Sequence, residues 1–245
     1  MKLRIKFSKY GAMVFIGHLD IMRYFQKAIR RAEIDISYST GFSPHQIMSF
    51  AQPLGVGVFS NGEYFDIGVD SITDAKQIKD ALNEKMVEGI DILSVTLLED
   101  GVENAMASVA AGLYTVRFRP GYEPDFDLFG QIDNFFAQDE IMVTKETKKS
   151  VKTFNLKEFV YSYSYSEKDQ TISLLLNASS SGNIKPSFVM NALYEYCRKQ
   201  AGEFDFLITR EDTYLDLGKI KAKNPKIIKV NEHTFAPLDY VGKDF

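Results

Sequence analysis

Two kinds of hydrophobic spacing follow one another along the chain, and their order limits the fold more than any other feature of the sequence. Charged and apolar residues alternate from Lys2 to Phe7, which is the period of a half-buried strand. Apolar residues then recur every three or four positions in 18–32, which is typical of a helix with one buried face. Asn61-Gly62 is a dipeptide that favours a two-residue hairpin turn. The first half therefore predicts strands at 2–7, 34–39 and 90–98, a hairpin at 56–67, and helices at 18–32 and 74–87.

The same kinds of segment recur after a stretch of small residues at 100–110, which we interpret as a linker. The predicted elements are strands at 113–119, 141–144, 151–165, 171–176 and 204–208 and helices at 127–138 and 186–196. Strand, helix, strand, strand, helix, strand is the order of the ferredoxin-like βαββαβ unit. The sequence therefore predicts an α+β fold of two tandem ferredoxin-like domains with antiparallel sheets, at 1–104 and 110–217, followed by a basic C-terminal tail at 218–245.

Composition excludes several classes of protein. Cys197 is the only cysteine, so this chain alone can form neither an internal disulfide nor a cysteine-based zinc or iron–sulfur site. No apolar run of the length of a membrane-spanning helix occurs, and the N-terminal MKLRIKF lacks the apolar core of a signal peptide, so we expect a cytoplasmic protein. A net charge of -4 argues against a protein that coats nucleic acid through bulk charge, but it allows a local basic surface.

Basic residues gather in three segments that could form such a surface if they meet on one face, namely 23–31, 145–157 and the tail at 219–229. Arg23, Lys27 and Arg31 share one face of the predicted helix at 18–32, with Arg30 beside them and Asp20 in the first turn. The segment at 145–157 carries a second group, which includes Lys148, Lys149 and Lys152 beside Phe154, and the alternating tyrosines Tyr161, Tyr163 and Tyr165 follow. Ferredoxin-like sheets can offer aromatic rings to unstacked bases while lysines hold phosphates. The alternative is a set of solvated lysines beside a sheet that helices cover.

Histidine offers the best candidates for chemistry. His18, at the start of the predicted helix, and His45, in the loop GFSPH, could act as general acid and base in RNA cleavage, since imidazole titrates near neutral pH. Both could equally be a helix-start contact and a loop hydrogen-bonding group. A metal site needs three or four clustered ligands, and the best set, His18 with Asp20 and His45 or Glu63, matches no established spacing. We therefore expect no metal and no cofactor.

Four segments carry a family resemblance: GHLD, IRRAEI, YSTGFSPH and GEYFDI. At these segments the sequence resembles the radical-SAM-linked family of bacterial proteins, a domain of unknown function that is encoded beside a radical SAM protein or fused to one carrying a cobalamin-binding region. The resemblance implies a radical SAM protein as partner and an association with RNA metabolism. Gln46, Ile47 and Met48 stand where the family pattern has Pro followed by Lys or Arg. The order of strands and helices is also similar to that of CRISPR repeat endoribonucleases.

Together these observations predict an accessory module that binds tRNA or rRNA for a radical SAM enzyme in RNA modification and performs no chemistry itself. We expect the basic face of the predicted helix at 18–32, His18, His45 and the turn that bears Phe42 to gather in one solvent-facing hollow. The expected binding residues are His18, Asp20, Arg23, Lys27, Arg30, Arg31, Phe42, His45, Lys148, Lys149 and Lys152. Two alternatives are a metal-independent endoribonuclease that uses His18 and His45, and a scaffold whose GFSPH loop docks the radical SAM protein.

Overall fold

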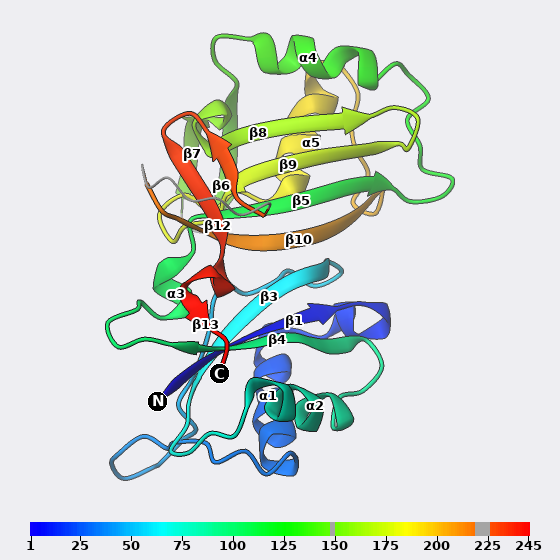
Figure 1. Cartoon of the computed structure of the whole chain (residues 1–245). Helices are drawn as coiled ribbons and strands as arrows, with labels where there is room; N and C mark the ends of the chain where they lie inside the picture. The colour runs from blue at the N-terminus through cyan, green and yellow to red at the C-terminus, as the bar shows by residue number, and fades with distance from the viewer. Residues whose placement is uncertain (148–149, 219–225) are drawn as a thin grey trace. The chain divides into compact units, whose positions relative to one another are not determined.

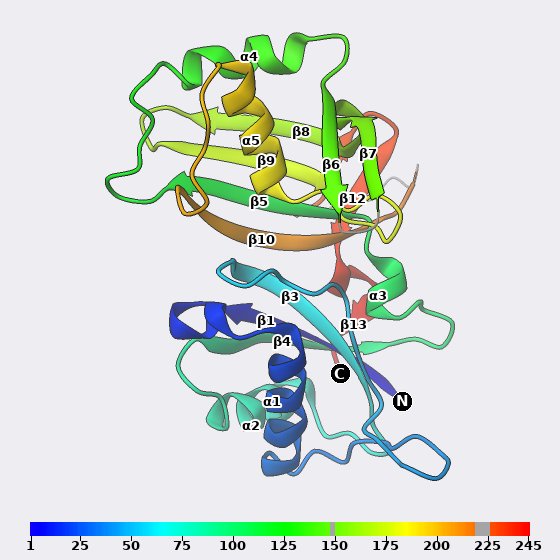
Figure 2. The ribbon, with the colours of Figure 1, turned by 180° about the vertical axis from the view of Figure 1, so that it is seen from behind.

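The computed structural model describes residues 1–147, 150–218 and 226–245, and the chain in it forms two compact units (Figures 1 and 2). The first unit combines Met1–Ala110 with Arg210–Phe245, and the second is Ala111–Thr209. The long strand β10 (Phe206–Asp216) contributes its beginning to the second unit and the rest to the first. Lys148 and Lys149 lie outside the described residues.

The first unit is built on three long antiparallel strands. β1 (Lys2–Lys9) lies between β3 (Phe59–Gly68) and β4 (Ile90–Leu98), and the short β2 (Met48–Phe50) pairs with the other edge of β3. The remaining elements are η1 (Gly11–Phe15), α1 (His18–Arg31), α2 (Ala75–Glu84), α3 (Ala105–Ser108), β11 (Ile228–Val230), β12 (His233–Pro237), η3 (Leu238–Val241) and β13 (Gly242–Lys243).

Helices α1 and α2 lie on the same face of this sheet (Figure 1). The apolar residues of β1, namely Leu3, Ile5 and Phe7, face them because side chains alternate between the two faces of a strand. The ring of Phe25, from α1, lies 4.8 Å from that of Phe7 and 4.6 Å from that of Phe65. Such ring pairs stabilise a core beyond the burial of their apolar area.

Charged side chains occupy the opposite face of β1. The guanidinium of Arg4 is fully buried and pairs with both carboxylate oxygens of Asp66 on β3, at 2.8 and 2.9 Å. Beside it, Lys6 Nζ lies 2.5 Å from Asp212 Oδ2, and the hydroxyl of Tyr64 donates to Asp212 Oδ1 at 2.6 Å. Burial raises the pKa of the Asp212 carboxyl, while the contacts with Lys6 and Tyr64 oppose that rise. These pairs join strands far apart in the sequence.

The second unit has a sheet of three antiparallel strands and a separate hairpin. β5 (Ala111–Phe118) and β8 (Val160–Ser166) both pair with β9 (Thr171–Asn177), whereas β6 (Met142–Thr147) and β7 (Ser150–Asn155) pair with each other. The short η2 (Leu156–Phe159) follows the hairpin. Side chains of α4 (Phe129–Ala137) and α5 (Pro186–Tyr196) build the core with those of β5 and β9. Pro186 begins α5, as predicted.

The fold is mixed α+β, and the prediction of two tandem ferredoxin-like domains is not confirmed. The main sheet is mixed rather than antiparallel throughout. Hydrogen bonds join Ser60 of β3 to Arg210 of β10 and Gly62 to Thr213, so the residue numbers rise together and these two strands run parallel. Residues 228–243 of the predicted tail carry strands and a 3-10 helix and belong to the first unit. Among the described residues, no helix combines the length and apolar character needed to cross a membrane.

Local predictions failed where distant residues decide the structure. The predicted turn at Asn61-Gly62 is wrong, because β3 runs straight through both residues. The predicted strand at 34–39 makes only the isolated bridges Ile36 with Val69 and Tyr38 with Gln46. The predicted linker contains α3, and the predicted strand at 151–165 is divided by η2.

Candidate functional site

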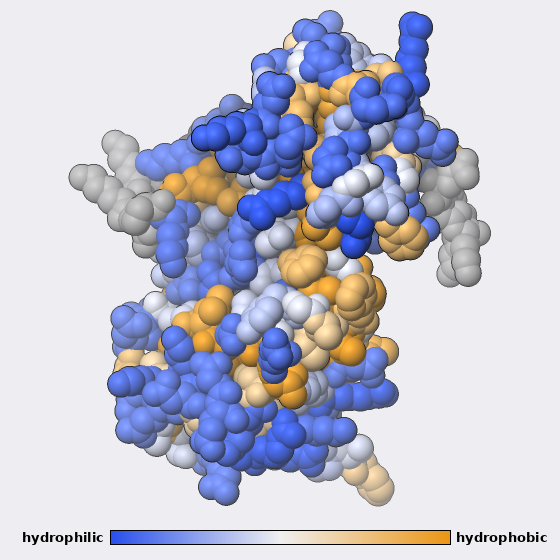
Figure 3. Space-filling model, turned by 90° about the vertical axis from the view of Figure 1, so that its right-hand side faces the viewer, coloured by the Kyte–Doolittle hydropathy of each residue, from blue (hydrophilic) through white to orange (hydrophobic). Residues whose placement is uncertain are grey.

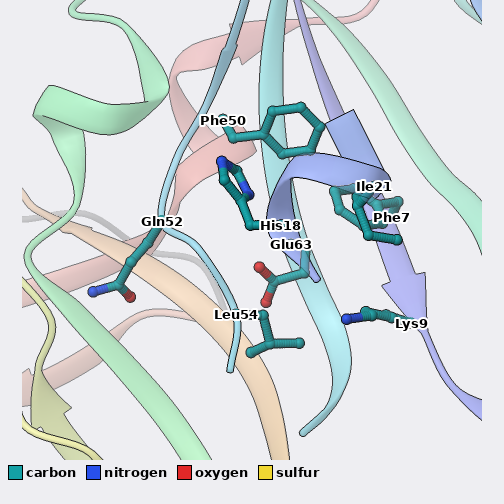
Figure 4. Close-up of a pocket in the computed structure, with 8 residues that line it drawn as sticks. All are labelled: Phe7, Lys9, His18, Ile21, Phe50, Gln52, Leu54 and Glu63. Atoms are coloured by element: carbon teal, nitrogen blue, oxygen red, sulfur yellow. The ribbon is translucent and has the colours of Figure 1, made fainter. Parts of the chain in front are cut away.

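A small pocket lies beside the N-terminus of α1, between that helix and strands β1 and β3 (Figure 4). Four of its lining side chains are polar and four are apolar: Lys9, His18, Gln52 and Glu63, and Phe7, Ile21, Phe50 and Leu54. The space open to the centre of a water-sized sphere is about 20 Å³. Room of this size accepts one or two water molecules or the polar end of a larger molecule.

Glu63 is held rigidly at the base of the pocket. Arg210 Nη1 donates to both carboxylate oxygens at 3.0 Å, and the hydroxyl of Ser60 donates to Oε1 at 2.7 Å. Burial raises the pKa of Glu63, while the positive charge of Arg210 and the Ser60 hydroxyl oppose the rise. Arg210 and Ser60 thus fix the orientation of the Glu63 carboxyl where it lines the pocket.

Lys9 enters the pocket from the end of β1, where the strand pairing is irregular. The register with β3 shifts between Phe7 and Lys9, and the register with β4 shifts between Lys6 and Phe7. Such a bulge re-aims the side chains beyond it. The ammonium of Lys9 donates to the carbonyl of Ile16 at 2.8 Å. Burial lowers the pKa of Lys9, and the charge of Glu63 partly offsets this.

His18 is the first residue of α1 and closes one side of the pocket. Its ring meets the edge of Phe50 with the centroids 5.3 Å apart. In the close-up, His18, Glu63 and Lys9 all line the same pocket, from α1, β3 and β1 (Figure 4). Burial lowers the pKa of His18, and the charge of Lys9 lowers it further. Three titratable groups with shifted pKa values around one opening are typical of a functional site.

We expect the imidazole of His18 to titrate below its ordinary pKa of 6.5. Between the pKa of His18 in the folded protein and 6.5, the imidazole therefore binds more protons in the unfolded chain than in the folded one. As the pH drops through this range, the contribution of His18 to the free energy of unfolding falls. An NMR titration of the ring protons measures the pKa directly. The Lys9→Met variant should raise the pKa of His18, because a nearby positive charge is removed; an equal or lower value in the variant would contradict this account.

The structure does not gather the other predicted residues around this pocket. His45 lies in the exposed loop after α1, where its Nδ1 lies 2.8 Å from the Ser39 hydroxyl, and Phe42 is fully exposed at the tip of that loop. The loop packs against α1 through Gln46, whose amide donates to the carbonyl of Gln26. Gln26 is eight residues beyond His18, or about 12 Å along the helix axis. His18 thus lines this pocket, and the other residues expected in the shared hollow do not.

The predicted basic residues of α1 are on its solvent face. Arg23, Lys27, Arg30 and Arg31 are all exposed, opposite the buried stripe that contains Phe25. Asp20 is exposed as well and lies 3.5 Å from Arg23, in a surface ion pair of the kind that contributes little to stability.

Three of the aromatic residues predicted to meet bases, Tyr163, Tyr165 and Phe154, contact helices α4 and α5. Tyr163 stacks on Phe136 of α4 at 4.0 Å, and the hydroxyls of Tyr163 and Tyr165 both donate to Asp133. Phe154 stacks on Phe188 of α5. Of the predicted lysines on the hairpin, Lys152 is exposed directly opposite Lys145. The ring of Tyr163 is thus covered by α4, Tyr165 stays 39% exposed, and the hairpin presents a pair of exposed cations.

Sequence reasoning found His18 but missed Lys9 as a member of the site and missed the role of Glu63. One signal was available for Glu63: it shares a face of β3 with Phe65 and Ile67, and a carboxylate in an apolar stripe indicates a buried, partnered acid. No pattern pointed to Arg210, which is 147 residues away. Among the described residues, no cluster of three or more His, Cys, Asp or Glu could hold a metal ion.

Comparison with known proteins gives a family and little else. The family model "Uncharacterized protein conserved in bacteria (DUF2344)" matches residues 2–186. No curated protein matches the chain. Among solved structures, the chain is similar to one chain of "Crystal Structure of a Cbf5-Nop10-Gar1 Complex", with a TM-score of 0.46 and 8% identity over 90% of this chain and 50% of that one. This chain thus spans about half the length of the structure it resembles.

Proposed function

The chain belongs to the bacterial family DUF2344, and we propose that it is an accessory RNA-binding protein that works beside a radical SAM enzyme. The observation that carries this proposal is the distribution of charge on α1. That helix exposes four basic side chains and one acidic side chain, although the whole chain has a net charge of -4. Such segregation is the electrostatic footprint expected of a surface that binds a polyanion.

The basic side chains are arranged as one stripe. Lys27, Arg30 and Arg31 follow Arg23 by four, seven and eight residues, which places them on successive turns of one helix face. In the described part of the chain, Lys27 and Arg30 take part in no ion pair. Their charge is therefore available to phosphates, and Arg can in addition hold a phosphate through two parallel hydrogen bonds.

The role beside a radical SAM enzyme rests on the sequence resemblance at GHLD, IRRAEI, YSTGFSPH and GEYFDI. With Cys197 as its single cysteine, the chain cannot hold an iron–sulfur cluster on its own thiolates. In the proposed division of labour, the partner supplies the cluster and the radical chemistry, and this protein supplies affinity for the RNA that is modified.

The Lys27→Gln/Arg30→Gln variant tests the proposal. We expect the wild-type protein to bind bulk tRNA at low salt and the variant to bind at least about tenfold more weakly, because two phosphate contacts are lost. Fluorescence anisotropy with end-labelled tRNA measures both affinities. The matched control is Lys168→Gln/Lys185→Gln, which removes two exposed lysines from the second unit and should keep wild-type affinity. Equal losses in the two variants, or no binding by the wild type, would reject α1 as the RNA-binding surface.

A further inference from the structure

The side chain of Lys9 is almost completely enclosed, with 3% of the residue exposed. None of the ion pairs among the described residues includes Lys9. One acceptor, the carbonyl of Ile16, serves a group that has three N–H donors. A buried cation in this condition is costly, and a negatively charged group that entered the pocket would relieve the cost.

Glu63 does not fill this role. Its carboxylate is engaged by Arg210 and Ser60, so the negative charge of the acid is largely matched before Lys9 is considered. With His18 held toward its neutral form by burial and by Lys9, the cations Lys9 and Arg210 share the carboxylate of Glu63, so the charge of Lys9 is only partly offset. Gln52 and His18 lie at the pocket wall and bring further polar atoms to it.

Apolar side chains line the pocket, and exposed ones lie close to its lining residues in the chain. Inside, the walls are the side chains of Phe7, Ile21, Phe50 and Leu54. Outside, Phe15, Leu19 and Val56 are 70%, 61% and 63% exposed, and the amide of Gly57 donates to the carbonyl of Val14, which joins the segment of Val56 to η1. Figure 3 views the first unit from the side on which η1 lies, and hydrophobic side chains are exposed there. Exposed apolar residues grouped beside a polar pocket indicate a binding surface.

We propose that this pocket binds a carboxylate carried on an apolar body, with the Lys9 ammonium as its ionic partner and these exposed apolar residues as the support for the body. The lining of the pocket favours this chemistry, because Phe7, Ile21, Phe50 and Leu54 bring apolar surface to the polar groups. Apolar walls also disfavour a doubly charged group more than a singly charged one. The pocket contains none of the basic residues of the α1 stripe, so carboxylate binding can be tested independently of RNA binding.

Sodium hexanoate is the first probe, and hexanamide is its neutral counterpart of the same shape. We expect hexanoate to bind at least about tenfold more tightly than hexanamide and than inorganic phosphate, with shifts confined to the His18 ring protons and their neighbours in NMR spectra. Lys9→Met should weaken hexanoate binding by at least about tenfold, whereas Lys76→Met, which removes an exposed charge from α2, should leave it unchanged. Thermal unfolding of each variant verifies that it is folded.

Two peptides identify the source of the carboxylate. A hexapeptide ending in leucine is compared as the free acid and as the C-terminal amide. Preference for the free-acid peptide over hexanoate indicates the end of a protein chain as ligand, and preference for hexanoate indicates a small acid; both outcomes support the site. Equal affinity for hexanoate and hexanamide, or hexanoate affinity unchanged in Lys9→Met, would overturn the proposal. The comparison of hexanoate with hexanamide uses the wild-type protein and remains decisive if Lys9→Met does not fold.

Discussion

Replacement of Arg4 by methionine is expected to lower the free energy of unfolding by about 3–5 kcal/mol. Arg4 is fully buried and makes four hydrogen bonds: two to the Asp66 carboxylate, one to the carbonyl of Leu238 and one to the carbonyl of Glu103. It thereby joins β1 to β3, to the segment before α3 and to the C-terminal segment. Methionine fills a similar volume but leaves the Asp66 carboxylate buried without its cation. Among the described residues, the backbone amide of Ala105 then remains as its hydrogen-bond donor. Urea denaturation followed by circular dichroism measures the loss.

A double variant separates the charge effect from general disruption. In Arg4→Met/Asp66→Leu both charges are absent, so the loss should be smaller than the sum of the losses in the two single variants. A loss of less than about 1 kcal/mol in Arg4→Met, of the size expected for a surface substitution, would contradict the role assigned to this pair. Additive losses in the double variant would contradict it as well.

Substitution of Gly62 by alanine is expected to cost about 1–3 kcal/mol, the range for overpacking a filled site. A Cβ atom at this position would lie 2.4 Å from Asp212 Oδ1 and 2.7 Å from Asp212 Cα, so backbone as well as side chain must move. Because Asp212 also holds Lys6 and Tyr64, the displacement would disturb a buried network. Thermal and urea unfolding of Gly62→Ala measure the cost.

Gly55 provides the control, since a Cβ there would meet Val58 at an ordinary contact distance of 3.5 Å. Gly55→Ala should change the free energy of unfolding by less than about 0.5 kcal/mol. If Gly62→Ala were as stable as Gly55→Ala, then the close approach of Asp212 to β3 would not be a feature of the protein in solution.

Hydrophobic periodicity predicted several elements correctly, whereas the local turn signal at Asn61-Gly62 did not. β1, α1 and β4 were predicted nearly to the residue, because each has a periodic pattern of apolar side chains that packs on a single core. Asn61-Gly62 carries an equally clear local signal for a turn, and yet the glycine is required by the approach of Asp212, 150 residues later in the chain. Local patterns hold no information about such a contact.

The candidate site was partly predictable for the same reason. His18 could be placed because it begins a well-patterned helix. The pocket depends in addition on a bulge that directs Lys9 and on Arg210 from a distant strand, neither of which leaves a mark in hydrophobic spacing. Phe42 and His45 were expected beside His18. They lie in a loop that contains Pro44 and Gly41 at positive φ, and hydrophobic periodicity does not determine the path of such a loop.

The salt dependence of tRNA binding tests the central claim most directly, because ionic contacts with phosphates release counterions. Each phosphate contact contributes roughly 0.7–0.9 to the slope of log K against log salt concentration. For Lys27→Gln/Arg30→Gln the account predicts a slope shallower than that of the wild-type protein by roughly 1.4–1.8, and for Lys168→Gln/Lys185→Gln an unchanged slope. Equal slopes for the wild type and the α1 variant would show that the RNA does not contact this helix.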